Sequence, residues 1–221
     1  MLLKNIDNLK QWFRWTLVCG IGELVGLAVA SMIEWVLWAT FGTSLFLLHG
    51  LLFLAVAIGA GYLEGWLSGF CQWIVLQERF PSISLKPWVR ASGFGAAIAW
   101  FLGSLPSIAF ASLPGFKFPP IMLVFTAILA GMILGGIIGL FQWRVLKNYS
   151  LHSGLWIIGN VLAWPIGTLI IYIVARTASS SSAPMLIFGL GAFSGLASGL
   201  AIGGITGLFF IALKPTGSKI N

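Results

Sequence analysis

Long apolar runs, separated only by short polar or proline-bearing stretches, follow one another through this chain of 221 residues. A helix needs about 20 predominantly apolar residues to cross the hydrocarbon core of a bilayer. Six runs are long enough, at residues 15–38, 46–75, 88–112, 121–146, 154–175 and 185–212. They are too long and too rich in glycine to be membrane β-strands, which alternate in character over about 10 residues. The sequence therefore predicts an all-α polytopic integral membrane protein with six transmembrane helices.

The composition supports a membrane protein and excludes two other classes. The chain is 59% hydrophobic and 8% charged, whereas a soluble domain is about one-quarter charged and a disordered chain is poor in apolar residues. With six spans, ten basic residues fall on one side of the membrane: Lys4, Lys10, Arg14, Arg79, Lys86, Arg90, Arg144, Lys147, Lys214 and Lys219. Only Lys117 and Arg176 fall on the other side, so the positive-inside rule predicts that both termini are cytoplasmic. Anionic lipid headgroups explain the net charge of +7, and nucleic acid is not an expected partner.

An internal repeat organises the chain. Residues 61–76 and 131–146 superpose without a gap, each with glycine at every fourth position and a closing Gln-Trp pair. The sixth run keeps the glycines but has Phe210 and Ile211 in place of that pair. We therefore predict three copies of a two-helix hairpin, at residues 15–80, 81–150 and 151–214.

Small-residue faces let helix backbones approach closely in lipid. The expected packing glycines are Gly61, Gly65, Gly69, Gly131, Gly135, Gly139, Gly199, Gly203 and Gly207. Tryptophans near the predicted cytoplasmic ends of the spans are interpreted as interfacial belt residues. They are Trp12, Trp15, Trp73, Trp88, Trp143 and Trp156.

Residues outside the three hairpins form two short segments. In residues 1–14, apolar side chains recur at helical spacing between charged ones, which is typical of an amphipathic helix lying in the cytoplasmic interface. Residues 215–221 are expected to form a polar C-terminal tail.

The repeated helix end, Gly-x-x-Gln-Trp-x-Val-Leu, is followed after a polar loop by a Trp-rich and Gly-rich opening. This pattern resembles multi-span membrane proteins common in cyanobacteria and some other bacteria, and the resemblance is best over residues 61–167. It implies a bacterial inner membrane or a thylakoid membrane. It implies no activity.

Two acidic residues lie deep within predicted spans, where ionisable groups are costly and often functional. At 1.5 Å per residue, Glu23 and Glu64 lie about 12 and 18 Å from the cytoplasmic ends of their spans, so contact between them is possible. Ser68 and Gln72 extend Glu64 into a polar stripe at helical spacing. Each acid is expected to be protonated, solvated by a cavity or bound to a cation. Together these residues are either a structural hydrogen-bonded group or a proton, cation or polar-ligand site.

Other polar residues have simpler interpretations. Gln142 and Asn160 are expected to bridge helices, and Arg144, beside Trp143, to contact a lipid headgroup. No histidine cluster, phosphate loop or catalytic motif is present in the sequence, so we expect neither a metal nor an enzyme. No cofactor is predicted, although bound lipid is expected and a pigment is an open alternative.

Two functional hypotheses follow, of which the sequence favours the first. The first is a non-catalytic accessory, scaffold or assembly subunit of a larger membrane complex, with other membrane proteins as partners. The second is a small transporter or substrate-binding subunit that uses Glu23 and Glu64. Apolar packing around isolated acids would favour the first hypothesis, and a cavity of about 300 Å³ or more would favour the second.

Overall fold

The computed structural model describes residues 2–41, 46–111, 119–177 and 183–216, and these form six α-helices. The helices are α1 (Leu2–Phe41), α2 (Phe46–Arg79), α3 (Leu85–Ala111), α4 (Pro120–Leu146), α5 (Leu155–Ala175) and α6 (Pro184–Ala212). The all-helical fold class is therefore confirmed. Lys117, Lys219 and most of the predicted tail lie outside the described residues.

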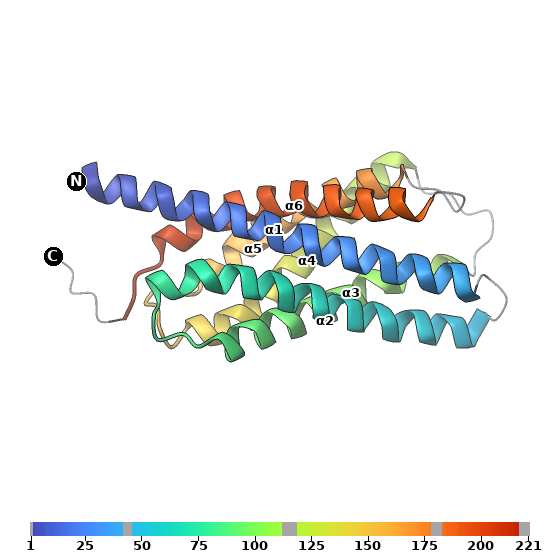
Figure 1. Cartoon of the computed structure of the whole chain (residues 1–221), viewed down its shortest axis with the longest axis horizontal. Helices are drawn as coiled ribbons and strands as arrows, with labels where there is room; N and C mark the ends of the chain where they lie inside the picture. The colour runs from blue at the N-terminus through green and yellow to red at the C-terminus, as the bar shows by residue number, and fades with distance from the viewer. Residues whose placement is uncertain (1, 42–45, 112–118, 178–182, 217–221) are drawn as a thin grey trace.

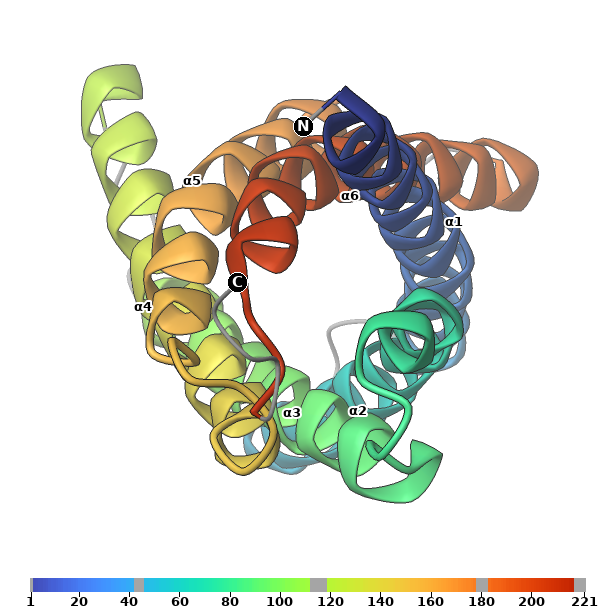
Figure 2. The ribbon, with the colours of Figure 1, turned by 90° about the vertical axis from the view of Figure 1, so that its left-hand side faces the viewer.

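The six helices form a closed ring. Each packs against its neighbours along the chain, and α6 packs back against α1 (Figures 1 and 2). Among the described residues, no helix packs across the ring. We call the end at which α1, α3 and α5 begin the near end, and the opposite end the far end (Figure 1).

Five helices are long and apolar enough to cross a membrane: α1, α2, α4, α5 and α6. All six carry large apolar side chains that are exposed on the protein, among them Phe94 of α3 and Phe125 of α4. Exposed apolar side chains of this kind are typical of a surface that contacts lipid rather than water.

The first helix is longer than the predicted span. Residues 2–14, expected to be a separate interfacial segment, continue without a break into the apolar run, so that α1 begins at Leu2. No proline or glycine separates the two parts, and nothing in the sequence between them ends a helix.

The glycines of α2, α4 and α6 lie against the next helix around the ring. A Cβ atom at Gly65 would lie 2.5 Å from the backbone oxygen of Ser92 in α3. One at Gly199 would lie 2.6 Å from the backbone oxygen of Cys19 in α1. The other packing glycines also lie close to the next helix, in two cases against tryptophan side chains (Gly61 and Gly207): Gly61, Gly69, Gly131, Gly135, Gly139, Gly203 and Gly207.

The near end is closed by an aromatic cluster. Trp15, Trp88 and Trp156 are at most 1% exposed, and Phe210 stacks on Trp15 at 4.5 Å between ring centroids. The belt interpretation is therefore wrong for these three tryptophans. Their rings point into the ring of helices, where indole contributes more buried apolar area than it does at an interface.

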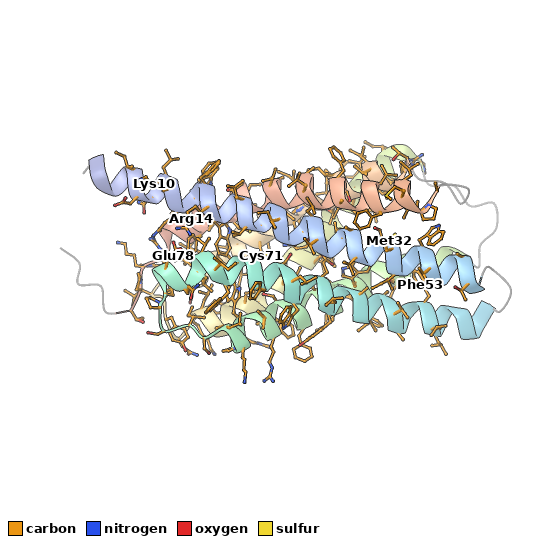
Figure 3. The ribbon with its side chains drawn as sticks, viewed as in Figure 1. Lys10, Arg14, Met32, Phe53, Cys71 and Glu78 are labelled. Carbon is orange, nitrogen blue, oxygen red and sulfur yellow. The ribbon has the colours of Figure 1, made fainter. Side chains whose placement is uncertain are left out.

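Two arginines connect helices around this closure. Arg79 of α2 donates to the backbone oxygens of Ile211 and Leu213 at the end of α6 and to Gln11 of α1. Arg14 of α1 forms a bidentate pair with Glu78 of α2 (Figure 3). The Arg14–Glu78 ion pair is half exposed and contributes at most about 1 kcal/mol to stability.

Candidate functional site

Glu23 of α1 and Glu64 of α2 lie inside the ring and are 6% and 5% exposed. The two side chains interact with each other and line the same cavity. Ser68 Oγ donates to Glu23 Oε1 at 2.8 Å, and the indole N–H of Trp100, from α3, donates to Glu64 Oε2. The structure thus brings together both acids and Ser68, the next residue of the predicted polar stripe.

The close approach of α1 and α2 depends on two glycines one turn apart. A Cβ atom at Gly22 would lie 2.8 Å from Cα of Ser68, and one at Gly26 would lie 2.6 Å from Cγ of Glu64. The missing side chains of α1 therefore make room for the polar residues of α2. Any larger residue at either position would separate the helices and the two acids.

A network of amides continues from the acids towards the near end. Gln142 of α4 donates to Gln72 Oε1 at 3.0 Å and to Ser92 Oγ at 2.9 Å, and it accepts from Trp156 Nε1 at 2.8 Å. It thereby links α4 with α2, α3 and α5, as expected of a helix-bridging amide. Gln72 also donates to Cys19 Sγ at 3.8 Å.

Asn160 differs from the expectation. Its side chain donates to the backbone oxygen of Trp156, one turn earlier in its own helix, rather than to a neighbouring helix. Its neighbour α4 is close at this point, since a Cβ atom at Gly139 would lie 3.0 Å from Cβ of Asn160. The side chain still reaches the interior of the ring.

A small polar cavity of about 30 Å³ lies beside the acids. It has room for about two water molecules. We call it the head cavity. All six helices contribute to its lining, and its polar residues are Cys19, Glu23, Glu64, Ser68, Gln72, Ser92, Gln142, Asn160 and Thr206.

A larger cavity of about 440 Å³, which we call the chamber, occupies the far half of the ring. Its lining is mainly apolar and aromatic and includes Phe53, Trp100, Trp164 and Tyr172. Figure 3 shows Phe53 on α2 in the far half of the molecule. Glu64, Ala96, Ile138 and Trp164 line both cavities, so the head cavity lies at the base of the chamber.

The lining has an acidic character that no basic group offsets. All of the residues that line the two cavities are described in the structure, and none is Lys, Arg or His. Glu23 Oε2 is buried and has no hydrogen-bond partner among the described residues. Those residues also hold no group of three or more His, Cys, Asp and Glu that is arranged to bind a metal ion.

Arg144 lies apart from this site. It is exposed at the near end, and its guanidinium is 5.0 Å from the centre of the Phe141 ring. It lines neither cavity, and its contact with a lipid headgroup stays a prediction.

Sequence reasoning missed Trp100 and Trp164. A depth count could have found Trp100, because it lies 12 residues from Trp88, the predicted start of its span, and Glu64 lies 12 residues from Leu76. At 1.5 Å per residue both are about 18 Å deep. Trp164 gives no such signal, since its depth does not show which face of the helix it occupies.

The chain matches no family model, no curated protein and no solved structure.

Proposed function

We propose that this protein binds a small ligand inside the membrane and acts as a transporter or substrate-binding subunit. The observation that carries this proposal is the chamber of about 440 Å³, whose base meets the Glu23–Glu64 pair. Ligand sites in proteins are mainly apolar hollows of about 300–1,000 Å³ with a few polar groups that orient the ligand. The chamber has that size and that character.

The accessory-subunit hypothesis lacks a comparable observation. Helices that serve only to hold neighbouring subunits gain stability from filling their interior, because empty space forfeits dispersion contacts. The exposed apolar side chains on the outside of the ring would contact lipid as readily as a partner protein. We therefore rank ligand binding above a scaffold role, with membrane lipids as surrounding partners.

The proposed membrane arrangement follows from the charges. We propose that α3 crosses the bilayer together with the five more apolar helices, since it has a similar length and completes the ring. Leaving Lys4 aside, the structure describes nine Lys and Arg residues, and eight of them lie at the near end. We therefore assign the near end to the cytoplasm. The chamber then faces the opposite side of a bacterial inner or thylakoid membrane, and Arg144 contacts lipid headgroups.

The three-hairpin repeat is part of the same proposal. Gln72 donates to Cys19, and Gln142 donates to Ser92. Cys19 and Ser92 each follow the matching tryptophan by four residues, so the two bonds join corresponding positions of the first two hairpins. Only the first hairpin supplies acids, and a repeated frame would thus carry a single binding site.

Mass spectrometry of the natively purified protein tests the proposed function. Gly103 lines the chamber, and a Cβ atom there would meet nothing within 4 Å. Gly103→Phe should therefore fill the chamber without displacing a helix. We expect a small molecule to co-purify with the native protein and to be lost from this variant.

Gly189 of α6 provides a matched control, because a Cβ atom there also meets open space but the residue lines neither cavity. Gly189→Phe should retain the small molecule. Equal retention by Gly103→Phe would contradict the proposal. Stoichiometric co-purification of other membrane proteins with no small molecule would favour the accessory-subunit hypothesis instead.

A further inference from the structure

The head cavity and the chamber differ in size and in chemistry, yet they share one boundary. The head cavity of about 30 Å³ holds a group no larger than one or two water molecules. The chamber of about 440 Å³ holds an organic body and is lined by four aromatic side chains, Phe53, Trp100, Trp164 and Tyr172. A ligand that fills both is an amphiphile with one small polar end.

Several hydrogen-bond donors around the head cavity are already in use. The Ser68 hydroxyl donates to Glu23, and the Trp100 indole donates to Glu64. The Gln142 amide donates to Gln72 and Ser92, while the Trp156 indole donates to Gln142. An anionic or purely accepting ligand group would have to compete with these bonds.

An acceptor, in contrast, is available. Glu23 Oε2 is buried and has no hydrogen-bond partner among the described residues, and Glu23 lines the head cavity. Glu64 lines the same cavity, and no basic side chain lines either cavity. A buried carboxyl oxygen in a lining without basic groups favours a cationic donor.

We propose that the head cavity binds the ammonium group of an organic amine whose apolar body occupies the chamber. This inference rests on the proposed ligand-binding function and specifies the substrate class. The ammonium donates to Glu23 Oε2, and the aromatic lining contacts the body of the ligand and attracts its cationic end. An inorganic cation is less suited, because the described residues hold no cluster of three metal-binding side chains and a metal ion would leave the chamber unfilled.

The test compares amines with alcohols of the same shape. We would measure ligand-induced thermal stabilisation and calorimetric binding of the purified protein with 2-phenylethylamine, 2-phenylethanol, hexylamine and hexan-1-ol, and with sodium chloride alone. Each alcohol has the apolar body of its amine but no charge, and both enter detergent micelles. We expect each amine to bind at least tenfold more tightly than its alcohol, since a charge-assisted hydrogen bond is involved.

Variants assign the preference to the acids. Glu23→Gln should lower amine affinity at least tenfold and leave alcohol affinity unchanged, and Glu64→Gln provides a second isosteric variant should the first fail to fold. Glu78→Gln is the matched control, because Glu78 pairs with Arg14 on the surface at the near end, remote from both cavities. It should bind amines as the native protein does.

The outcomes separate this inference from the function on which it rests. Equal binding of amines and alcohols, with both lost in Gly103→Phe, would overturn the amine assignment and leave the ligand-binding function standing. Stabilisation by sodium chloride alone that disappears in Glu23→Gln would replace the amine by an inorganic cation. Binding of no compound, together with no co-purified small molecule, would overturn both proposals.

Discussion

At the scale of single residues, Gln142 joins several helices in the interior. Its amide nitrogen donates to Gln72 and Ser92, its oxygen accepts from Trp156, and its side chain is 1% exposed. A buried polar group whose partner is removed loses its hydrogen bond without regaining water. This one amide therefore joins α4 to its neighbours α3 and α5 and also to α2.

Gln142→Leu should destabilise the protein by about 1–3 kcal/mol, because it leaves the buried Trp156 N–H without its acceptor. The measurement is thermal or chemical unfolding in detergent. Gln77→Leu is the control, since Gln77 forms only an exposed bond to Ile74 in its own helix. Equal stability of the two variants would show that the network contributes little.

Prediction from the sequence succeeded where the depth of a residue along its predicted span decides which side chains can meet. Glu23 and Glu64 have similar depths in adjacent antiparallel helices, and they meet. It failed for Trp15, Trp88 and Trp156, which depth places near the membrane surface but which face inward. An indole at that depth suits either environment, and only the rotation of the helix distinguishes them.

At the scale of helices, the contact between α4 and α5 shows why the glycines recur. A Cβ atom at Gly135 would overlap the backbone oxygen of Asn160, and one at Gly131 would lie 2.6 Å from Cα of Pro165. Backbone atoms cannot rotate away as a side chain can. The two helices must therefore separate if either glycine is enlarged.

Gly135→Ala should lower the free energy of unfolding by about 1–3 kcal/mol through overpacking against α5. The neighbouring residue is a close control: a Cβ atom at Gly136 would lie 3.5 Å from Val161 Cγ2, an ordinary contact. Gly136→Ala should be neutral or slightly stabilising, since alanine favours helix. A larger loss of stability in Gly136→Ala than in Gly135→Ala would contradict this packing.

The helices themselves were predictable, because apolar runs of about 20 residues have few alternatives in a membrane. The start of α1 was not, since residues 2–14 have the periodicity of a separate surface helix but no stop signal before the apolar run. The ring order was also not predictable. It depends on α6 packing against α1, a contact between the two ends of the chain that local patterns do not encode.

At the scale of the whole molecule, the ring is closed at one end and hollow at the other. Trp15, Trp88, Trp156 and Phe210 fill the near end, and Arg79 ties α2 to the end of α6 across it. The chamber occupies the far half and is partly open. Under the proposed function, we expect a ligand to enter from the far end and to stop at the Glu23–Glu64 pair, because passage to the near end would require the aromatic cluster to separate.

Single cysteines can test this arrangement in intact membranes. Ser104 of α3 and Ser198 of α6 are both buried, at 8% and 0% exposed, but only Ser104 lines the chamber. In a protein whose Cys19 and Cys71 are replaced by alanine, Ser104→Cys should react with a small, charged methanethiosulfonate added to spheroplasts. Ser198→Cys should not react, because burial without an adjoining cavity excludes the reagent. The reaction at Ser104→Cys should also slow when 2-phenylethylamine occupies the chamber.

The same variants determine which end of the ring faces the cytoplasm. Inverted vesicles present the near end to the reagent, and the aromatic cluster should then protect Ser104→Cys, so that its rate falls at least tenfold relative to spheroplasts. Faster reaction in inverted vesicles would reverse the proposed orientation. No reaction from either side would mean that the chamber is sealed, and a sealed chamber would be incompatible with ligand entry from the far end.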